Sequence, residues 1–204
     1  GASKGEGLGN KFLSHIREVD AIIHLVRCFE SDKITHVNSK INPIDDLETI
    51  KTEIILSDLD IIQKKLEKSK KKLLEEKEIK ILEDKLKQLN DGKEVVANDK
   101  DEAKFLTTLG LLSIKPKIIV CNVDEESLAK GNSYTESVKK NYSEEKVVTI
   151  CADIEDQIMG LDNDERETFM KEIGLNKTGL NQLIKEGYEL LNLDTFFTSG
   201  PEES

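Results

Sequence analysis

Two short polar segments stand where a ligand would be expected to bind. Asn122-Val123-Asp124-Glu125 follows the apolar run 118–121, and Cys151-Ala152 follows the apolar run 147–150. In an open parallel sheet, ligands bind beyond the carboxyl ends of the strands, and both segments would then share one edge. An amide and several carboxylates at that edge can hydrogen-bond a ligand.

The remaining chemically interesting groups suit structural roles better. The three cysteines (Cys28, Cys121 and Cys151) have no CxxC or Cys/His spacing, and each lies near the end of an apolar run. We expect buried thiols, with neither a disulfide framework nor a zinc site, which fits a reducing cytoplasm. His24 lies inside an apolar run and is expected to be a hydrogen-bonded core histidine, whereas His15 is expected to be exposed.

Three short apolar runs predict the strands that position these segments. The runs 21–26, 117–121 and 147–151 are β-branched and do not alternate, which is typical of strands covered on both faces. Helical patterns over 12–19, 134–142 and 165–173 separate or flank them. We therefore predict an α/β fold with a mostly parallel sheet wound from βαβ units.

The middle of the chain departs from this alternation. Apolar residues recur at heptad spacing over 55–73 and again, in a shifted phase, over 79–89. We expect an antiparallel helical coiled-coil hairpin inserted between strands, with a further helix from Lys100 to Leu112 leading back to the sheet. One continuous kinked helix is the alternative.

The bulk composition limits the partners. The formal net charge is −11, so the chain as a whole does not attract nucleic acid, and no direct sequence-specific nucleic-acid binding is expected. A local basic run over 64–72 favours a solvated helix face, with a contact to RNA or a ribosomal surface as the alternative. No apolar stretch of this sequence is long enough to span a membrane, and we expect no signal peptide.

The positions of the two polar segments match the base-recognition loops of GTPase-like domains, usually Asn-Lys-x-Asp and Ser-Ala-Lys. Further stretches resemble the YchF/Obg-like ATPase family more specifically, and this resemblance runs the length of the chain. They are Gly1 to Leu13, Ile16 to Ile22, Val26 to Glu30, Asn42 to Asp46, Asn122 to Glu125, and Leu190 to Thr198. The family implies a P-loop NTPase of G-domain type that hydrolyses ATP and binds ribosomes.

The resemblance also implies a division of the chain. Residues 1–44 and 109–192 would form two parts of the nucleotide-binding domain, 45–108 the hairpin, and 193–204 the start of a TGS domain. The phosphate-binding loop Gly-x-x-x-x-Gly-Lys-Ser/Thr does not occur in these residues, so we expect an internal part of a longer protein that hydrolyses no ATP by itself. ATP would bind with Mg²⁺, whose ligands are expected in an N-terminal part outside this sequence, and no metal ligand is expected within it.

Individual roles follow from the same resemblance. Gly5, Gly7 and Gly9 match a glycine-rich loop, the tail of switch II, which must move when the γ-phosphate leaves. His36 matches a family histidine proposed to place the attacking water. Asn122, Val123, Asp124, Glu125, Cys151 and Ala152 match the loops that bind the base.

The base loop favours ATP. An aspartate in the GTPase pattern accepts two hydrogen bonds from guanine, whereas Glu125 is one methylene longer and would overshoot. Val123 replaces the lysine whose stem packs on the base, and Asn122 would keep its contact with the base or brace the loops. Two alternatives remain: a non-catalytic interaction module with a helical hairpin, or a GTP-specific Obg/DRG-type GTPase.

Overall fold

A small parallel sheet organises the molecule. The structure, a computed structural model, describes residues 8–31, 41–69 and 74–197. Within these ranges the strands β1 (Ile22–Arg27), β2 (Lys117–Asn122) and β3 (Lys146–Ile150) lie in the order β1-β2-β3, and both pairs are parallel. The α/β fold with a parallel sheet is confirmed. The register pairs Arg27 with Asn122 and Asn122 with Ile150, so all three strands end at one edge.

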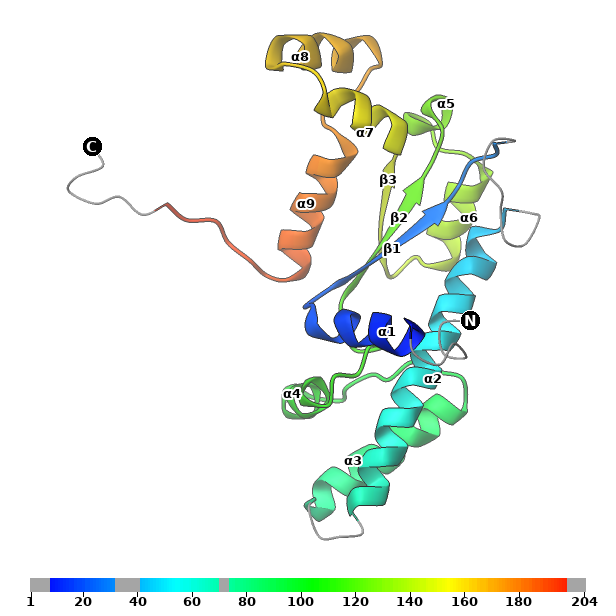
Figure 1. Cartoon of the computed structure of the whole chain (residues 1–204), viewed down its shortest axis with the longest axis vertical. Helices are drawn as coiled ribbons and strands as arrows, with labels where there is room; N and C mark the ends of the chain where they lie inside the picture. The colour runs from blue at the N-terminus through cyan, green and yellow to red at the C-terminus, as the bar shows by residue number, and fades with distance from the viewer. Residues whose placement is uncertain (1–7, 32–40, 70–73, 198–204) are drawn as a thin grey trace, which may run out of the picture.

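Helices connect and cover the strands (Figure 1). They are α1 (Leu8–Glu18), α2 (Pro43–Ser69), α3 (Glu76–Asn90), α4 (Lys100–Thr108), α5 (Glu125–Leu128), α6 (Ser133–Asn141), α7 (Ala152–Met159), α8 (Asn163–Glu172) and α9 (Gly179–Leu190). The predicted helices over 134–142 and 165–173 correspond to α6 and α8. The expected glycine loop is wrong for Gly9, which lies in the first turn of α1.

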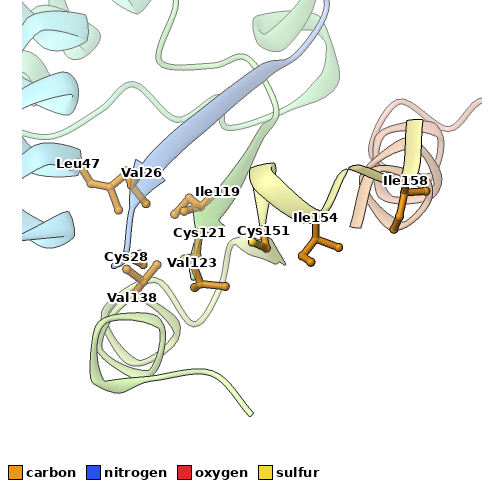
Figure 2. Packing of buried hydrophobic residues seen from close by; sticks show 10 residues of the cluster. All are labelled: Val26, Cys28, Leu47, Ile119, Cys121, Val123, Val138, Cys151, Ile154 and Ile158. Atoms are coloured by element: carbon orange, nitrogen blue, oxygen red, sulfur yellow. The ribbon is translucent and has the colours of Figure 1, made fainter. Parts of the chain in front are cut away.

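The sheet carries a core on each face. On one face, Val26 and Cys121 pack with Leu47 of α2 and Val138 of α6 (Figure 2). The other face buries Ile118, Val120 and Val148 against two leucines of α9, Leu183 and Leu190. All three cysteines are free and buried, as predicted.

Strand β1 is not covered on both faces, and that part of the prediction is wrong. Ile23 and Leu25 are 54% and 60% exposed. Helix α9 packs against β3 and β2, and β1 lies at the edge of the three described strands. Beside it an apolar groove of about 410 Å³ runs between α1 and α2. Length and composition alone do not distinguish such a strand from a central one.

The inserted segment forms two helices, which confirms the hairpin rather than one kinked helix. Helices α2 and α3 pack along each other, and Ile62, Leu82 and Leu89 are buried in their shared core. Helix α3 begins with a capping box in which Glu75 and Glu78 each bind the other's backbone N–H. This box satisfies donors that the helix cannot pair internally, so the second arm starts independently of the first.

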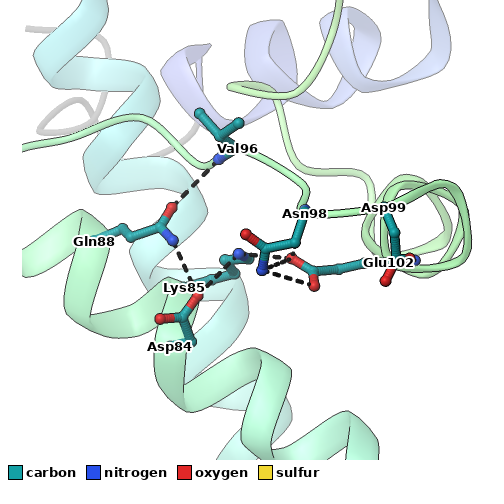
Figure 3. Close-up of polar contacts among 7 residues, drawn as sticks. All are labelled: Asp84, Lys85, Gln88, Val96, Asn98, Asp99 and Glu102. Carbon is teal, nitrogen blue, oxygen red and sulfur yellow. Dashed lines mark hydrogen bonds and ion pairs between the residues drawn. The ribbon is translucent and has the colours of Figure 1, made fainter.

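Buried polar contacts help to attach the hairpin to the rest of the described chain, and two groups of them stand out. Lys85 of α3 is fully buried and lies 2.6 Å from a carboxylate oxygen of Glu102 on α4 (Figure 3). Nearer the sheet, buried Asp58 of α2 accepts hydrogen bonds from the backbone N–H groups of Leu112 and Ser113, both 2.8 Å long. These contacts join α2 and α3 to the chain that leads into β2.

Candidate nucleotide-binding site

The two predicted loops lie side by side at the carboxyl edge of the sheet. The Asn122 side chain accepts a hydrogen bond from the backbone N–H of Ala152 through Oδ1, at 3.0 Å. The Val123 N–H donates to the carbonyl oxygen of Ile150, at 2.8 Å. Asn122 therefore braces the two loops through its side-chain oxygen. Its amide NH₂ group can donate hydrogen bonds to a ligand.

A cleft of about 150 Å³ opens between these loops. Its lining includes all six residues predicted to bind a base, together with Phe29, Asp153 and Gln157. Pockets that enclose a drug-sized ligand usually measure about 300–1,000 Å³. This cleft is smaller, and its size suits a planar base rather than a whole nucleotide.

The two carboxylates of the first loop differ in their surroundings. Asp124 is the N-cap of α5, and its Oδ1 accepts the backbone N–H of Ser127 at 2.9 Å. This bond satisfies one of the donors at the start of the helix. Glu125 is the first residue of α5 and is exposed. The structure therefore uses Asp124 for the helix and leaves the Glu125 side chain at the mouth of the cleft.

The side chains of Val123 and Cys151 belong to the core beneath the cleft. Each is only 2% exposed and packs in the cluster that holds Val26 and Cys121. Val123 stands where the GTPase pattern has a lysine, but its side chain points into the protein and packs in the core. Burial raises the pKa of the Cys151 thiol, so this group is a neutral core residue at neutral pH and not a nucleophile.

Phe29 is a cleft residue whose role the sequence did not reveal. It follows the end of β1, is half-buried, and lines the cleft together with the two loops. The Arg27 guanidinium lies 4.9 Å from the centre of the Phe29 ring, and Arg27 Nε donates to the Phe29 carbonyl oxygen at 3.0 Å. The sequence signal for Phe29 is its position just after the first predicted strand, the same kind of position that identified the other two segments.

The other predicted functional residues do not join the cleft. His36, Gly5 and Gly7 lie outside the described residues, and Gly9 lies in α1. His24 is buried as expected, but no described residue hydrogen-bonds its Nε2, so the expected pairing of this side chain is incomplete. His15 is exposed, as expected.

The described residues contain neither a cluster of metal-binding side chains nor a helix suited to a membrane. Over 8–31, 41–69 and 74–197, no three His, Cys, Asp or Glu side chains converge to hold a metal ion. None of the helices in these ranges combines the length and apolarity needed to cross a bilayer.

Comparison with known proteins identifies relatives along the whole chain. No protein family model matches it. The Ribosome-binding ATPase YchF of Bacillus subtilis is 41% identical over 216 residues, and that of Haemophilus ducreyi is 44% identical over 212 residues. Both alignments include 100% of this chain and 58% of the relative, so the chain spans a little over half the length of these proteins.

A solved structure agrees with the sequence comparison. It is described as the Schizosaccharomyces pombe YchF GTPase, with a TM-score of 0.83 and 30% identity, and the match covers 98% of this chain and 57% of that one. The sheet and its covering helices are thus shared with that protein. By sequence over its full length and by fold, the chain belongs to the YchF family.

Proposed function

We propose that the protein containing this chain is an ATP-binding and ATP-hydrolysing switch that associates with ribosomes, and that this chain supplies its base-recognition half. The observation that carries the proposal is the cleft shared by Asn122–Glu125 and Cys151–Ala152 at the carboxyl edge of the sheet. The relatives named as ribosome-binding ATPases support the activity and the partner. An association with ribosomes in turn supports a cytoplasmic location.

The cleft residues would bind and orient the base. Phe29 offers an aromatic face for stacking, and the Asn122 amide offers a donor to a ring nitrogen. Glu125 replaces the shorter aspartate that pairs with guanine, which weakens the guanine-specific contact. These groups would bind the base only, and residues outside the cleft would bind the triphosphate.

The remaining parts of the proposal rest on family resemblance. Mg²⁺ would neutralise charge on the phosphates, with ligands outside the described residues. Gly5, Gly7 and Gly9 would belong to switch II, and His36 would place the attacking water. The segments 1–44 and 109–192 would form the nucleotide-binding domain, 45–108 the coiled-coil insertion, and 193–204 the start of the TGS domain.

A GTP-using protein is the second candidate, because the matching solved structure is described as a GTPase. Calorimetric titration of the whole protein with ATP, GTP and tripolyphosphate distinguishes the two. We expect tighter binding of ATP than of GTP, and a loss of ATP affinity in Asn122→Ala with tripolyphosphate affinity unchanged. Equal loss for both ligands, or no loss, would show that this cleft does not bind the base.

A further inference from the structure

Asn132 connects two parts of the cleft lining, Phe29 after β1 and the Asn122–Glu125 loop after β2, which we call the walls of the cleft. Asn132 itself does not line the cleft. It is the N-cap of α6, where its Oδ1 accepts the backbone N–H of Thr135 at 3.0 Å. Its Nδ2 donates in two other directions, to the carbonyl oxygen of Cys28 at 2.7 Å and to Ser127 Oγ at 3.2 Å. Cys28 precedes the Phe29 wall, and Ser127 lies on α5, the helix that begins at Glu125.

Both partners of Asn132 are also tied to the base loop. The Cys28 N–H donates to the carbonyl oxygen of Asn122, at 2.7 Å, while the Ser127 N–H donates to Asp124 Oδ1. Both backbone polar groups of Cys28 are thus paired, its N–H with Asn122 and its carbonyl oxygen with Asn132. Moving Asn132 would shift the strand end that carries Phe29 relative to the helix that carries Glu125.

The turn before Asn132 has a conformation that depends on glycine. Gly131 has a φ of 72°, a value that favours glycine, and a Cβ there would lie 2.8 Å from Thr135 Oγ1. The Gly131 N–H donates to the carbonyl oxygen of Ser127, at 2.7 Å. The turn that presents Asn132 is thus itself hydrogen-bonded to Ser127 of α5, the helix that begins at Glu125.

The residue type exceeds what a cap requires. Serine, aspartate and asparagine cap helices about equally well because each supplies an oxygen acceptor. Only the asparagine among these three also carries an amide donor that can reach two further acceptors. The bonds to Cys28 and Ser127 use that donor, so they depend on asparagine in a way that the cap does not.

We propose that Asn132 is a positioning residue for base recognition, which sets the separation between Phe29 and the Asn122–Glu125 loop. This inference rests on the proposed function, because it assumes that the cleft holds the base. Since Asn132 acts on the cleft walls, its loss weakens ligands that carry a base and leaves the bare triphosphate unaffected.

Asn132→Asp in the whole protein separates the clamp from the cap. Aspartate keeps the acceptor for Thr135 but has no amide to donate to the Cys28 carbonyl oxygen, so that bond is lost. The Ser127 hydroxyl can still donate to the carboxylate, and the loss of the Cys28 bond is therefore what this variant tests. We expect ATP affinity to fall at least about tenfold, the change that corresponds to about 1.4 kcal/mol, with tripolyphosphate affinity within about twofold of the wild type. Asn132→Ala, which loses both functions, should lower ATP affinity by a similar factor.

Two further variants keep the test decisive. Asp162→Ala removes the N-cap of α8, a helix that contributes no residue to the cleft lining, and should leave ATP affinity unchanged. Ser127→Ala removes one acceptor of the Asn132 amide while keeping the cap and the Cys28 bond. It should lower the affinity for ATP by a smaller factor and leave the affinity for tripolyphosphate unchanged. This milder variant carries the test if Asn132→Asp does not fold.

The outcomes distinguish failure of this inference from failure of the proposed function. If the wild type binds ATP but Asn132→Asp or Ser127→Ala binds it equally well, Asn132 does not position the cleft. A parallel loss of ATP and tripolyphosphate would assign Asn132 a general structural role and overturn the inference. A wild type that binds tripolyphosphate but gains nothing from the base would overturn both proposals.

Discussion

Glu125 is the carboxylate of the first loop that can distinguish bases, because Asp124 in the same loop is used as a helix cap. Shortening Glu125 to Asp brings the carboxylate back toward a length that pairs with two guanine donors. Hydrogen bonds to a charged group contribute about 1.5–3 kcal/mol each. In the whole protein we therefore expect Glu125→Asp to raise the affinity for GTP relative to ATP at least about tenfold, as measured by calorimetry.

Glu126→Asp is the matched control for this change. Glu126 is the next residue of α5 and is also exposed, but it does not line the cleft. The Glu126→Asp variant should leave the ratio of the GTP and ATP affinities unchanged. An unaltered ratio in folded Glu125→Asp would mean that this carboxylate does not contact the base.

Val123 has a structural role, although it occupies the position of a base-packing lysine in the GTPase pattern. Its side chain is 2% exposed in an apolar cluster. We expect Val123→Lys to lower the free energy of unfolding by at least about 2 kcal/mol, because it buries an amine without a partner. Val123→Ile should cost less, and urea denaturation of the 204-residue chain measures both. A Val123→Lys chain as stable as the wild type would show that this side chain reaches solvent at the cleft.

At the scale of elements, the buried ion pair between Lys85 and Glu102 holds α3 to α4. Burial opposes ionisation of Glu102, but hydrogen bonds from Lys85 and Asn98 outweigh it and lower the pKa of this carboxyl. Lys85→Met leaves Glu102 without its cation, and breaking a buried pair in this way costs about 3–5 kcal/mol. We expect a loss of that order at pH 7 in urea denaturation. The double variant Lys85→Met/Glu102→Leu should recover much of it.

The same pair predicts a pH dependence with a definite sign. A carboxyl whose pKa is lowered in the folded state adds stability above its unfolded pKa, about 4.3 for glutamate, and loses it as the pH falls through the folded pKa. The difference between wild type and Lys85→Met should therefore be largest near neutrality and shrink below about pH 4. A difference that is constant across this range would show that Glu102 is not ionised in the folded chain.

The sequence predicted these elements better than it predicted their environment. The strand runs were found within a residue or two because β-branched residues cluster there, and the heptad spacing predicted the hairpin. The position of Asn122 at the end of a strand was enough to predict that it lies close to Ala152. By contrast, the burial of Val123 and the exposure of Leu25 depend on neighbours distant in the sequence, which local patterns do not specify. Phe29 was missed because only two of three strand ends were considered.

At the scale of the whole molecule, the two faces of the sheet are unequally covered. Among the described strands, β1 pairs with β2 alone, and its Ile23 and Leu25 side chains remain exposed beside Phe12 of α1, which is itself 60% exposed. An apolar edge strand with one free side can pair with another chain. The isolated 204-residue chain should therefore associate with itself through β1 as its concentration rises.

Leu25→Lys tests this surface directly. In the isolated chain we expect it to reduce self-association measured by light scattering, because a charge on an edge strand opposes pairing. Its free energy of unfolding should change by less than about 0.5 kcal/mol, as is usual for exposed positions. Val26→Lys, on the buried face of the same strand, should instead unfold the chain. If Leu25→Lys also unfolded it, the outer face of β1 would have to be covered within the 204 residues.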